Sequence, residues 1–345
     1  MQQRLGWLDY SKTIAIYLVI LGHTAICPAL EQFIYVFHMP LFFFMAGYVF
    51  KFEKQPTYRQ FLKKNTSQLL LPYLLLNCLT FIFWLFISSQ VGSDTTDVKS
   101  SFHIPLIAIF YGHPKSLLHD IPLWFILALF VIRNLFYILY RNSSHTRTIT
   151  IIVLLAAIII YTFEIFTLPL CLDIAIIVLP IYALGYYARV KGLNFDNAIV
   201  FGISLIILVM SYILNGKVAI HVSQYNNLAL FYMGGITGCY AIIFIAKKLH
   251  AIIGDQKLIT FIATNTLLIC AFHLPSFTVI KGVLLYVFNF SPDKISGSIL
   301  PNILLSLISL CICLILSILV NKYTPILSGY RTKQNYQDTL AKAAH

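Results

Sequence analysis

Charged residues are scarce in this sequence, and acidic residues are the scarcest of them. Of its 345 residues, 10% are Asp, Glu, Lys or Arg and only 12 are acidic, whereas 59% are hydrophobic and the mean hydropathy is +0.84. A water-soluble globular protein needs far more charged and polar residues to cover its surface. The composition therefore excludes a soluble globular protein and predicts a polytopic membrane protein.

Long polar stretches, paired cysteines and glycine-rich loops are also missing. The longest polar stretches, about 90–121 and 322–345, are too short to bury a core of their own. The seven cysteines form no CxxC pair, so neither a disulfide framework nor a thiolate metal site is indicated. We therefore expect one transmembrane domain over 1–330, followed by a cytoplasmic tail over 331–345.

Ten apolar runs are present, each close to the roughly 20 residues that cross a bilayer as a helix. The apolar segment "HIPLIAIFYG" at 103–112 is too short to span and predicts an interfacial or re-entrant piece. The sequence therefore predicts an all-α membrane bundle of about ten transmembrane helices. Their expected ranges are 13–30, 33–50, 67–89, 122–140, 148–166, 170–188, 198–214, 227–246, 259–280 and 299–321.

The loops of one side carry most of the basic residues. With the N-terminus inside, 18 of the 24 Lys and Arg residues fall in cytoplasmic loops, five fall outside and Arg133 lies within the fourth helix. An excess of Lys and Arg marks the cytoplasmic side of a membrane protein. Both termini are therefore expected in the cytoplasm, and the net charge of +12 reflects topology rather than a nucleic-acid partner.

Three histidines lie inside the expected spans, where ionisable residues are expensive and often functional. At about 1.5 Å per residue, His23, His38 and His273 are expected roughly 7–10 Å below the outer ends of their helices, so that they share one polar cavity. A proline follows His38 and His273 by two residues, in "FHMP" and "FHLP". Such a proline frees a backbone carbonyl, which is tolerated where polar groups or water line a cavity.

The three histidines are also compatible with a structural role or a metal site. Each of them could form a plain interhelical hydrogen bond that ties the bundle together. Three histidines match the number of ligands of a catalytic zinc site, but the short ligand spacing of such sites is absent. No metal is therefore expected.

Lys12 precedes His23 by 11 residues, which returns to nearly the same face of a helix while separating the two residues by about 16 Å. A cation at the cytoplasmic mouth and a base deeper on the same wall suit a long substrate with an anionic head and a reactive tip, which is the shape of acyl-coenzyme A. The alternative for Lys12 is an ordinary basic anchor at the membrane interface.

Six segments together resemble the acyltransferase 3 family, the multi-pass bacterial O-acyltransferases of surface carbohydrates. They follow the order of that family over nearly the full chain, and jointly they are specific. The segments are "LDYSKTIAIYLVILGHT", "FHMPLFFFMAGYVF", "KKNTSQLLLPY", "PLWFILALF", "YALGYYAR" and "NTLLICAFHLP".

The resemblance implies a ten-helix protein of the bacterial inner membrane. Such a protein takes an acyl group, usually acetyl, from cytoplasmic acetyl-CoA and delivers it to a hydroxyl of a cell-surface glycan or a lipid-linked sugar. It implies that Lys12 and His23 are the functional pair, and it points further to His38, Phe43, Gly47, Tyr48, Trp124, Asn265 and His273. Two departures stand out: Ala46 replaces a serine that is frequent in relatives, and Lys63 and Lys64 stand where many relatives have paired arginines.

Roles can be assigned on chemical grounds. A sugar hydroxyl needs a general base, which an imidazole supplies near neutral pH, and we expect His23 in this role. An oxyanion needs donors, for which Asn265, Tyr48 or a second histidine are candidates. The phosphates of the donor are expected on the loop 51–66, which carries Arg59, Lys63 and Lys64, with Lys12 and Arg133 nearby.

Each of these assignments has an alternative. The basic residues of the loop 51–66 also fit the ordinary excess of positive charge on the cytoplasmic side, and the Arg133 side chain can reach the membrane interface. Trp124 and Tyr48 are expected to contact the substrate; the alternative for Trp124 is an aromatic residue at the membrane interface. Two other classes of function also remain open. One is a carrier of lipid-linked sugars or small solutes, for which broken helices in symmetry-related halves would be expected. The other is a membrane interaction or sensor protein without chemistry.

Overall fold

The computed structural model describes residues 5–54, 57–90, 103–117 and 119–329. Within these ranges the secondary structure is helical, and the β-structure consists of one isolated bridge between Ala219 and Gln224. The all-α prediction is therefore confirmed. The predicted tail over 331–345 lies outside the described residues.

Every one of the ten predicted apolar runs forms helix. Eight helical segments are long and apolar enough to cross a membrane among the residues described, and α7 is apolar but shorter. The helix α1 has 17 residues and includes Asp9 and Lys12, so the count of ten crossings stays a prediction. The helices are α1 (Gly6–Gly22), α2 (Pro28–Tyr48), α3 (Tyr58–Asn65), α4 (Leu71–Phe86), α5 (His103–Tyr111), α6 (Trp124–Tyr140), α7 (Thr146–Thr162), α8 (Leu172–Val190), α9 (Ala198–Asn215), α10 (Leu228–Ile253), α11 (Lys257–Thr264), α12 (Thr266–Tyr286) and α13 (Ile299–Tyr323).

The boundaries of the first two helices differ from the prediction. The helix α1 begins at Gly6 and ends at Gly22, so His23 is its C-terminal cap rather than a residue seven positions inside a span. The chain then turns through Ala25, which has a φ of 57°, and Pro28 starts α2. The turn is itself largely apolar, and hydropathy therefore did not reveal it.

The third predicted helix begins earlier than expected. Thr57 accepts a hydrogen bond from the Gln60 amide at its N-terminus, and α3 then continues through a π-helical segment, Thr66–Leu70, into α4. The helical segment Tyr58–Phe86 is 29 residues long. Much of the stretch 51–66, which was expected to be a basic loop, is therefore helix.

The ninth predicted helix is broken. Asn265 ends α11 and precedes α12, and its buried side chain donates to the Phe261 carbonyl and accepts from the Asn321 amide of α13. The second half extends to Tyr286, so His273 lies 13 residues before the end of α12 instead of seven. The expected depth of His273 was therefore wrong, because α12 continues past residue 280, through Lys281, to Tyr286.

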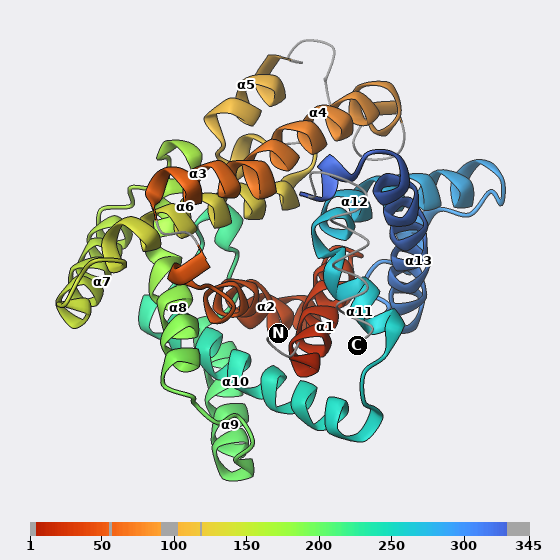
Figure 1. Ribbon diagram of the computed structural model, residues 1–345. Coiled ribbons are helices and arrows are strands. Elements are labelled where there is room, and N and C mark those ends of the chain that lie inside the picture. The colour runs from red at the N-terminus through yellow and green to blue at the C-terminus, as the bar shows by residue number, and fades with distance from the viewer. Residues whose placement is uncertain (1–4, 55–56, 91–102, 118, 330–345) are drawn as a thin grey trace.

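The helices α1 and α2 lie in the middle of the bundle (Figure 1). The helix α2 packs against α8 and α10, and α1 packs against α2, α10, α11, α12 and α13. The crossing of α2 and α8 brings backbone against backbone: a Cβ on Gly47 would collide with the Tyr182 carbonyl oxygen, and a Cβ on Gly185 with the Phe44 carbonyl oxygen. These reciprocal glycines hold α2 close to its neighbour.

Contacts between connecting segments support the predicted alternation of the helices. The Lys217 ammonium lies 3.2 Å from the Glu31 carboxylate, which joins the connector between α9 and α10 to the first turn of α2. On the opposite face, Gly6 of α1 lies against His250 in the last turn of α10 and against Asp255 just beyond it. We call the face with the Lys217–Glu31 ion pair the outer face, and the face with Gly6 and Asp255 the inner face. The helix α5 has only nine residues and exposes Ile107 and Phe110, consistent with a segment too short to span.

Candidate functional site

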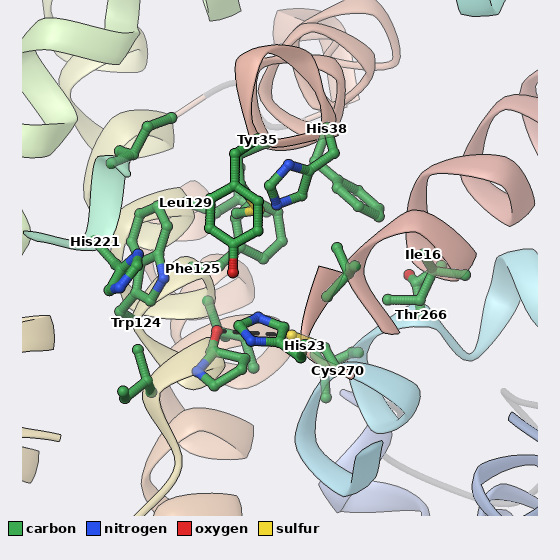
Figure 2. A pocket seen from close by; sticks show the side chains of 18 of the residues that line it. Ile16, His23, Tyr35, His38, Trp124, Phe125, Leu129, His221, Thr266 and Cys270 are labelled. Carbon is green, nitrogen blue, oxygen red and sulfur yellow. Dashed lines mark hydrogen bonds between the residues drawn. The ribbon is translucent and has the colours of Figure 1, made fainter. Parts of the chain in front are cut away.

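Two cavities meet at His23. The first, which we call the central cavity, has a volume of about 230 Å³ and lies among α1, α2, α6 and α12. Its lining is mostly apolar and aromatic, and its polar side chains include those of His23, Tyr35, His38 and His221. Figure 2 shows these side chains projecting into it from different elements.

The second cavity, which we call the outer cavity, is larger, at about 680 Å³. It lies toward the outer face, and Trp84, Ser88, His119, Lys281 and Asp293 are among the residues that line it. Burial lowers the pKa of His119 to about 4, so this imidazole is neutral at physiological pH.

His23 and Ile121 line both cavities. As the C-terminal cap of α1, His23 stands where the helix ends and the chain turns, and it lines the cavity on each side of that turn. A group in this position can contact one molecule in the central cavity and another in the outer cavity. No other ionisable side chain among the described residues lines both.

The three predicted histidines approach one another without all lining one cavity. The ring centroids of His23 and His273 are 5.2 Å apart, while His38 lies 4.9 Å from Tyr35, whose ring is 6.2 Å from His23. His23 and His38 line the central cavity, and His273 is fully buried behind His23. The cavity itself is mainly apolar, in contrast to the polar cavity expected.

Hydrogen bonds fix the tautomers of His38 and His273. The Nδ1 atom of His38 lies 2.8 Å from the Ile34 carbonyl, and that of His273 lies 2.8 Å from the Cys270 carbonyl. A carbonyl oxygen only accepts, so Nδ1 carries the proton in both rings and Nε2 of the neutral imidazole presents a lone pair. The Nε2 atom of His273 is buried and has no hydrogen-bond partner among the described residues.

Lys12 lies on the same face of α1 as His23, as the spacing predicted. Ile16 and Val19 line the central cavity between them, and the four residues follow one another at intervals of four, three and four. The Lys12 side chain is half-buried. It lies one helical turn nearer the inner face than Ile16, the nearest residue of α1 that lines the cavity. On α6, Arg133 lies one helical turn nearer the inner face than Leu129, which lines the cavity.

More cations gather beside Arg133 at the inner face. Lys64 of α3 lies close enough to Lys54 and Arg133 to be repelled by both charges. Desolvation, followed by the charges of Arg189 and Lys54, lowers the pKa of the Lys51 ammonium. Like charges held together in this way form a site that favours a multiply charged anion.

The other predicted basic residues point elsewhere. Arg59 and Lys63 are exposed on α3, whereas Lys64 of the same helix is half-buried. The Arg133 guanidinium lies 5.8 Å from the centroid of the Phe61 ring, which turns it toward the bundle rather than to the interface. The structure thus brings Lys64 and Arg133 together and leaves Arg59 and Lys63 at the surface.

Of the two predicted aromatic residues, Trp124 reaches the central cavity. It is only 4% exposed and lines the cavity, so the alternative of an interface aromatic is wrong. Tyr48 lies near the inner face, with its ring centroid 5.3 Å from that of Trp7 and with Arg189 over its ring. Asn265 is fully buried at the helix break, and neither Asn265 nor Tyr48 lines the central or the outer cavity.

Sequence reasoning missed Tyr35 and His221. Tyr35 precedes His38 by three residues on the same face of α2, and this i, i+3 spacing is the signal that could have revealed it. His221 is in a short 3₁₀ turn, Ile220–Val222, between α9 and α10, where no periodic pattern marks its direction. The described residues contain no group of three side chains that could hold a metal ion.

Comparison with known proteins gives one match. A family model described as an acyltransferase domain matches residues 5–322, nearly the whole chain. No curated protein and no solved structure matches.

Proposed function

From the premise that the chain belongs to the acyltransferase 3 family, we propose that it is an O-acetyltransferase of the bacterial inner membrane. It takes the acetyl group from acetyl-CoA at the inner face and transfers it to a hydroxyl of a carbohydrate at the outer face. The acceptor is a cell-surface glycan or a lipid-linked sugar. Family membership supports an acyltransferase that spans the membrane, and the donor and acceptor are the proposal.

The observation that carries this proposal is the position of His23. Among the described residues, His23 is the ionisable residue that lines both the central and the outer cavity. A transfer between two substrates that approach from opposite sides needs its base where the two approaches meet. An imidazole suits that role near neutral pH.

The inner face supplies the features that a coenzyme A donor needs. Lys12 and Arg133 lie one turn below the lining of the central cavity, and Lys64 lies beside Arg133. Phosphate groups are bound by such cations, Arg through paired hydrogen bonds and Lys as a point charge. The apolar central cavity then receives the thioester end, where water is excluded and electrostatic interactions are strong.

The reaction follows from this placement. The acceptor hydroxyl oxygen attacks the thioester carbonyl carbon, and His23 takes the hydroxyl proton as the C–O bond forms. The tetrahedral oxyanion then collapses, the C–S bond breaks, and the coenzyme A thiolate leaves with the proton returned by the His23 imidazolium. The products are the ester and free coenzyme A, and no proton is gained or lost overall.

His273 positions His23 in this scheme. Its Nε2 lone pair is buried, and the His23 ring lies against it at 5.2 Å between centroids. If His23 donates its N–H to this lone pair, the other nitrogen of His23 is left unprotonated and directed at the acceptor. A base held in one tautomer by a third group is the arrangement found in other acyl-transfer enzymes.

Transfer of label tests the proposal. Membranes that contain the wild-type protein, His23→Ala or His145→Ala at matched levels are given acetyl-labelled acetyl-CoA, and alkali-labile label is measured in the glycan fraction. His145 is exposed before α7 and serves as the control. We expect label with the wild type and His145→Ala and a loss of roughly 100-fold or more with His23→Ala. Absence of label with the wild type, together with movement of a lipid-linked sugar, would instead identify a carrier.

A further inference from the structure

The proposed reaction passes through an oxyanion, and His23, His38 and His273 cannot stabilise it. His38 and His273 donate their Nδ1–H groups to backbone carbonyls and present lone pairs at Nε2. His23 is the base. Donors of another origin are therefore required where the thioester carbonyl lies.

We propose that the Tyr35 hydroxyl and a ring N–H of His221 form the oxyanion site, on the wall of the central cavity that faces His23. The inference rests on the proposed function. Neither residue belongs to the motifs that relate the chain to its family.

Tyr35 reaches the cavity from α2. Its ring centroid lies 6.2 Å from that of His23 and 4.9 Å from that of His38. Figure 2 shows its hydroxyl projecting into the cavity between His23 and His221. A phenol is a hydrogen-bond donor at neutral pH, and in an apolar surrounding its donation to an oxyanion is strong.

His221 reaches the cavity from the connector between α9 and α10, and Figure 2 shows its ring among the side chains that line the cavity. Burial, followed by the charge of Lys217, lowers its pKa, and it is therefore neutral near pH 7 with one N–H. No backbone carbonyl accepts from its ring within the described part of the chain. Its N–H is thus available to a substrate, unlike those of His38 and His273.

The connector is built to hold His221 still. Ala219 and Gln224 exchange two backbone hydrogen bonds of 2.8 and 3.0 Å. The Asn226 side chain donates to the carbonyls of Asn215 and Lys217, and the Asn215 side chain donates to the Tyr225 carbonyl. Preorganised donors are what makes an oxyanion site effective, because they need no rearrangement as charge develops.

Two further features tie the two donors together. The ion pair of Lys217 with Glu31 links the connector to α2 one turn before Tyr35. Tyr35 and His221 both line the central cavity and are absent from the lining of the outer cavity. They therefore face the thioester of the donor, whereas His23 alone also faces the acceptor.

In the proposed step, the bond that forms between the acceptor oxygen and the carbonyl carbon moves the carbonyl electron pair onto its oxygen. Tyr35 and His221 donate hydrogen bonds to that oxygen without giving up their protons. When the C–S bond breaks, the electron pair returns and the two hydrogen bonds weaken. The only proton that moves passes from the acceptor to His23 and on to the thiolate.

Four variants test the inference in the labelled acetyl-CoA assay. Tyr35→Phe removes one oxygen atom, His221→Leu removes the ring donor, and His221→Gln keeps an N–H donor that cannot act as a base. Tyr286→Phe, exposed near the outer end of α12, is the control for tyrosine. Folding is checked by thermal unfolding of the purified full chain.

We expect Tyr35→Phe and His221→Leu each to lower kcat by roughly 10²–10³-fold with little change in the KM for acetyl-CoA, because an oxyanion contact exists only in the transition state. His221→Gln should keep kcat within about tenfold of the wild type.

Equal losses in His221→Gln and His221→Leu would show that His221 acts as a base and would overturn the inference. So would wild-type kcat in Tyr35→Phe, and this variant decides even if His221→Leu does not fold. A wild-type protein that transfers no label would refute the proposed function itself, which is a different outcome.

Discussion

The imidazole rings of His23 and His273 lie 5.2 Å apart between centroids, although the two residues come from helices near opposite ends of the chain. His23 borders both cavities, and His273 is fully buried behind it. The bundle is thus arranged so that one accessible imidazole is backed by one inaccessible imidazole.

His273→Leu should lower kcat by roughly 10²-fold, since the proposed scheme requires the His273 Nε2 lone pair to accept the His23 N–H during the reaction. His273→Gln should recover part of that loss, because the amide oxygen can accept the same N–H. The measurement is kcat for both variants alongside their thermal unfolding. A merely structural role would show equal losses in activity and stability, with no recovery by glutamine.

Gly185→Ala should destabilise the protein by about 2 kcal/mol or more, because the added methyl meets the backbone oxygen of Phe44, which cannot move aside. The matched control is Gly202→Ala in α9, where a Cβ has nothing within 4 Å. Thermal unfolding in detergent should show a lower midpoint for the first variant and an unchanged or higher one for the second. Equal midpoints would contradict the close crossing of α2 and α8.

Lys64→Ala should raise the KM for acetyl-CoA roughly tenfold with little effect on kcat, because a charge-assisted hydrogen bond to a phosphate contributes about 1.5 kcal/mol or more. Arg147→Ala, at an exposed arginine in the first turn of α7, is the control and should leave KM unchanged. The effect should shrink at high salt. A lower kcat at constant KM would place Lys64 outside the donor site.

Asn265→Ala should cost about 1–3 kcal/mol of stability, because the Asn321 amide loses the oxygen to which it donates at 2.6 Å. We expect kcat per folded molecule to stay close to that of the wild type, since Asn265 lines neither cavity. Thermal unfolding and kcat, measured on the same preparation, separate the two effects. A large loss of kcat without destabilisation would restore Asn265 as an oxyanion donor.

Much of the fold could be predicted from hydropathy, because each of the ten apolar runs forms helix. The exact ends could not. The turn at Ala25 and the break at Asn265 lie within apolar sequence, where a change in backbone direction leaves no polar mark. The predicted depths of the histidines depended on the outer ends of the helices, and they were wrong because α1 ends before His23 and α12 continues to Tyr286.

The candidate site was predictable where residues share one helix. The 11-residue spacing placed Lys12 and His23 on one face of α1, and the intervening cavity residues lie on it too. Contacts between distant segments were not predictable. The direction of His221 depends on hydrogen bonds from Asn215 and Asn226, and the burial of Trp124 depends on how α6 meets the other helices.

The most direct test of a base between two approaches is a transfer assay with sealed vesicles of known orientation. Labelled acetyl-CoA is supplied only to the inner face or only to the outer face, and ester label is measured on glycan at each face. We predict label only when the donor is at the inner face, deposited on glycan at the outer face and lost in His23→Ala. Label that requires donor and acceptor at the same face would contradict a transfer across His23.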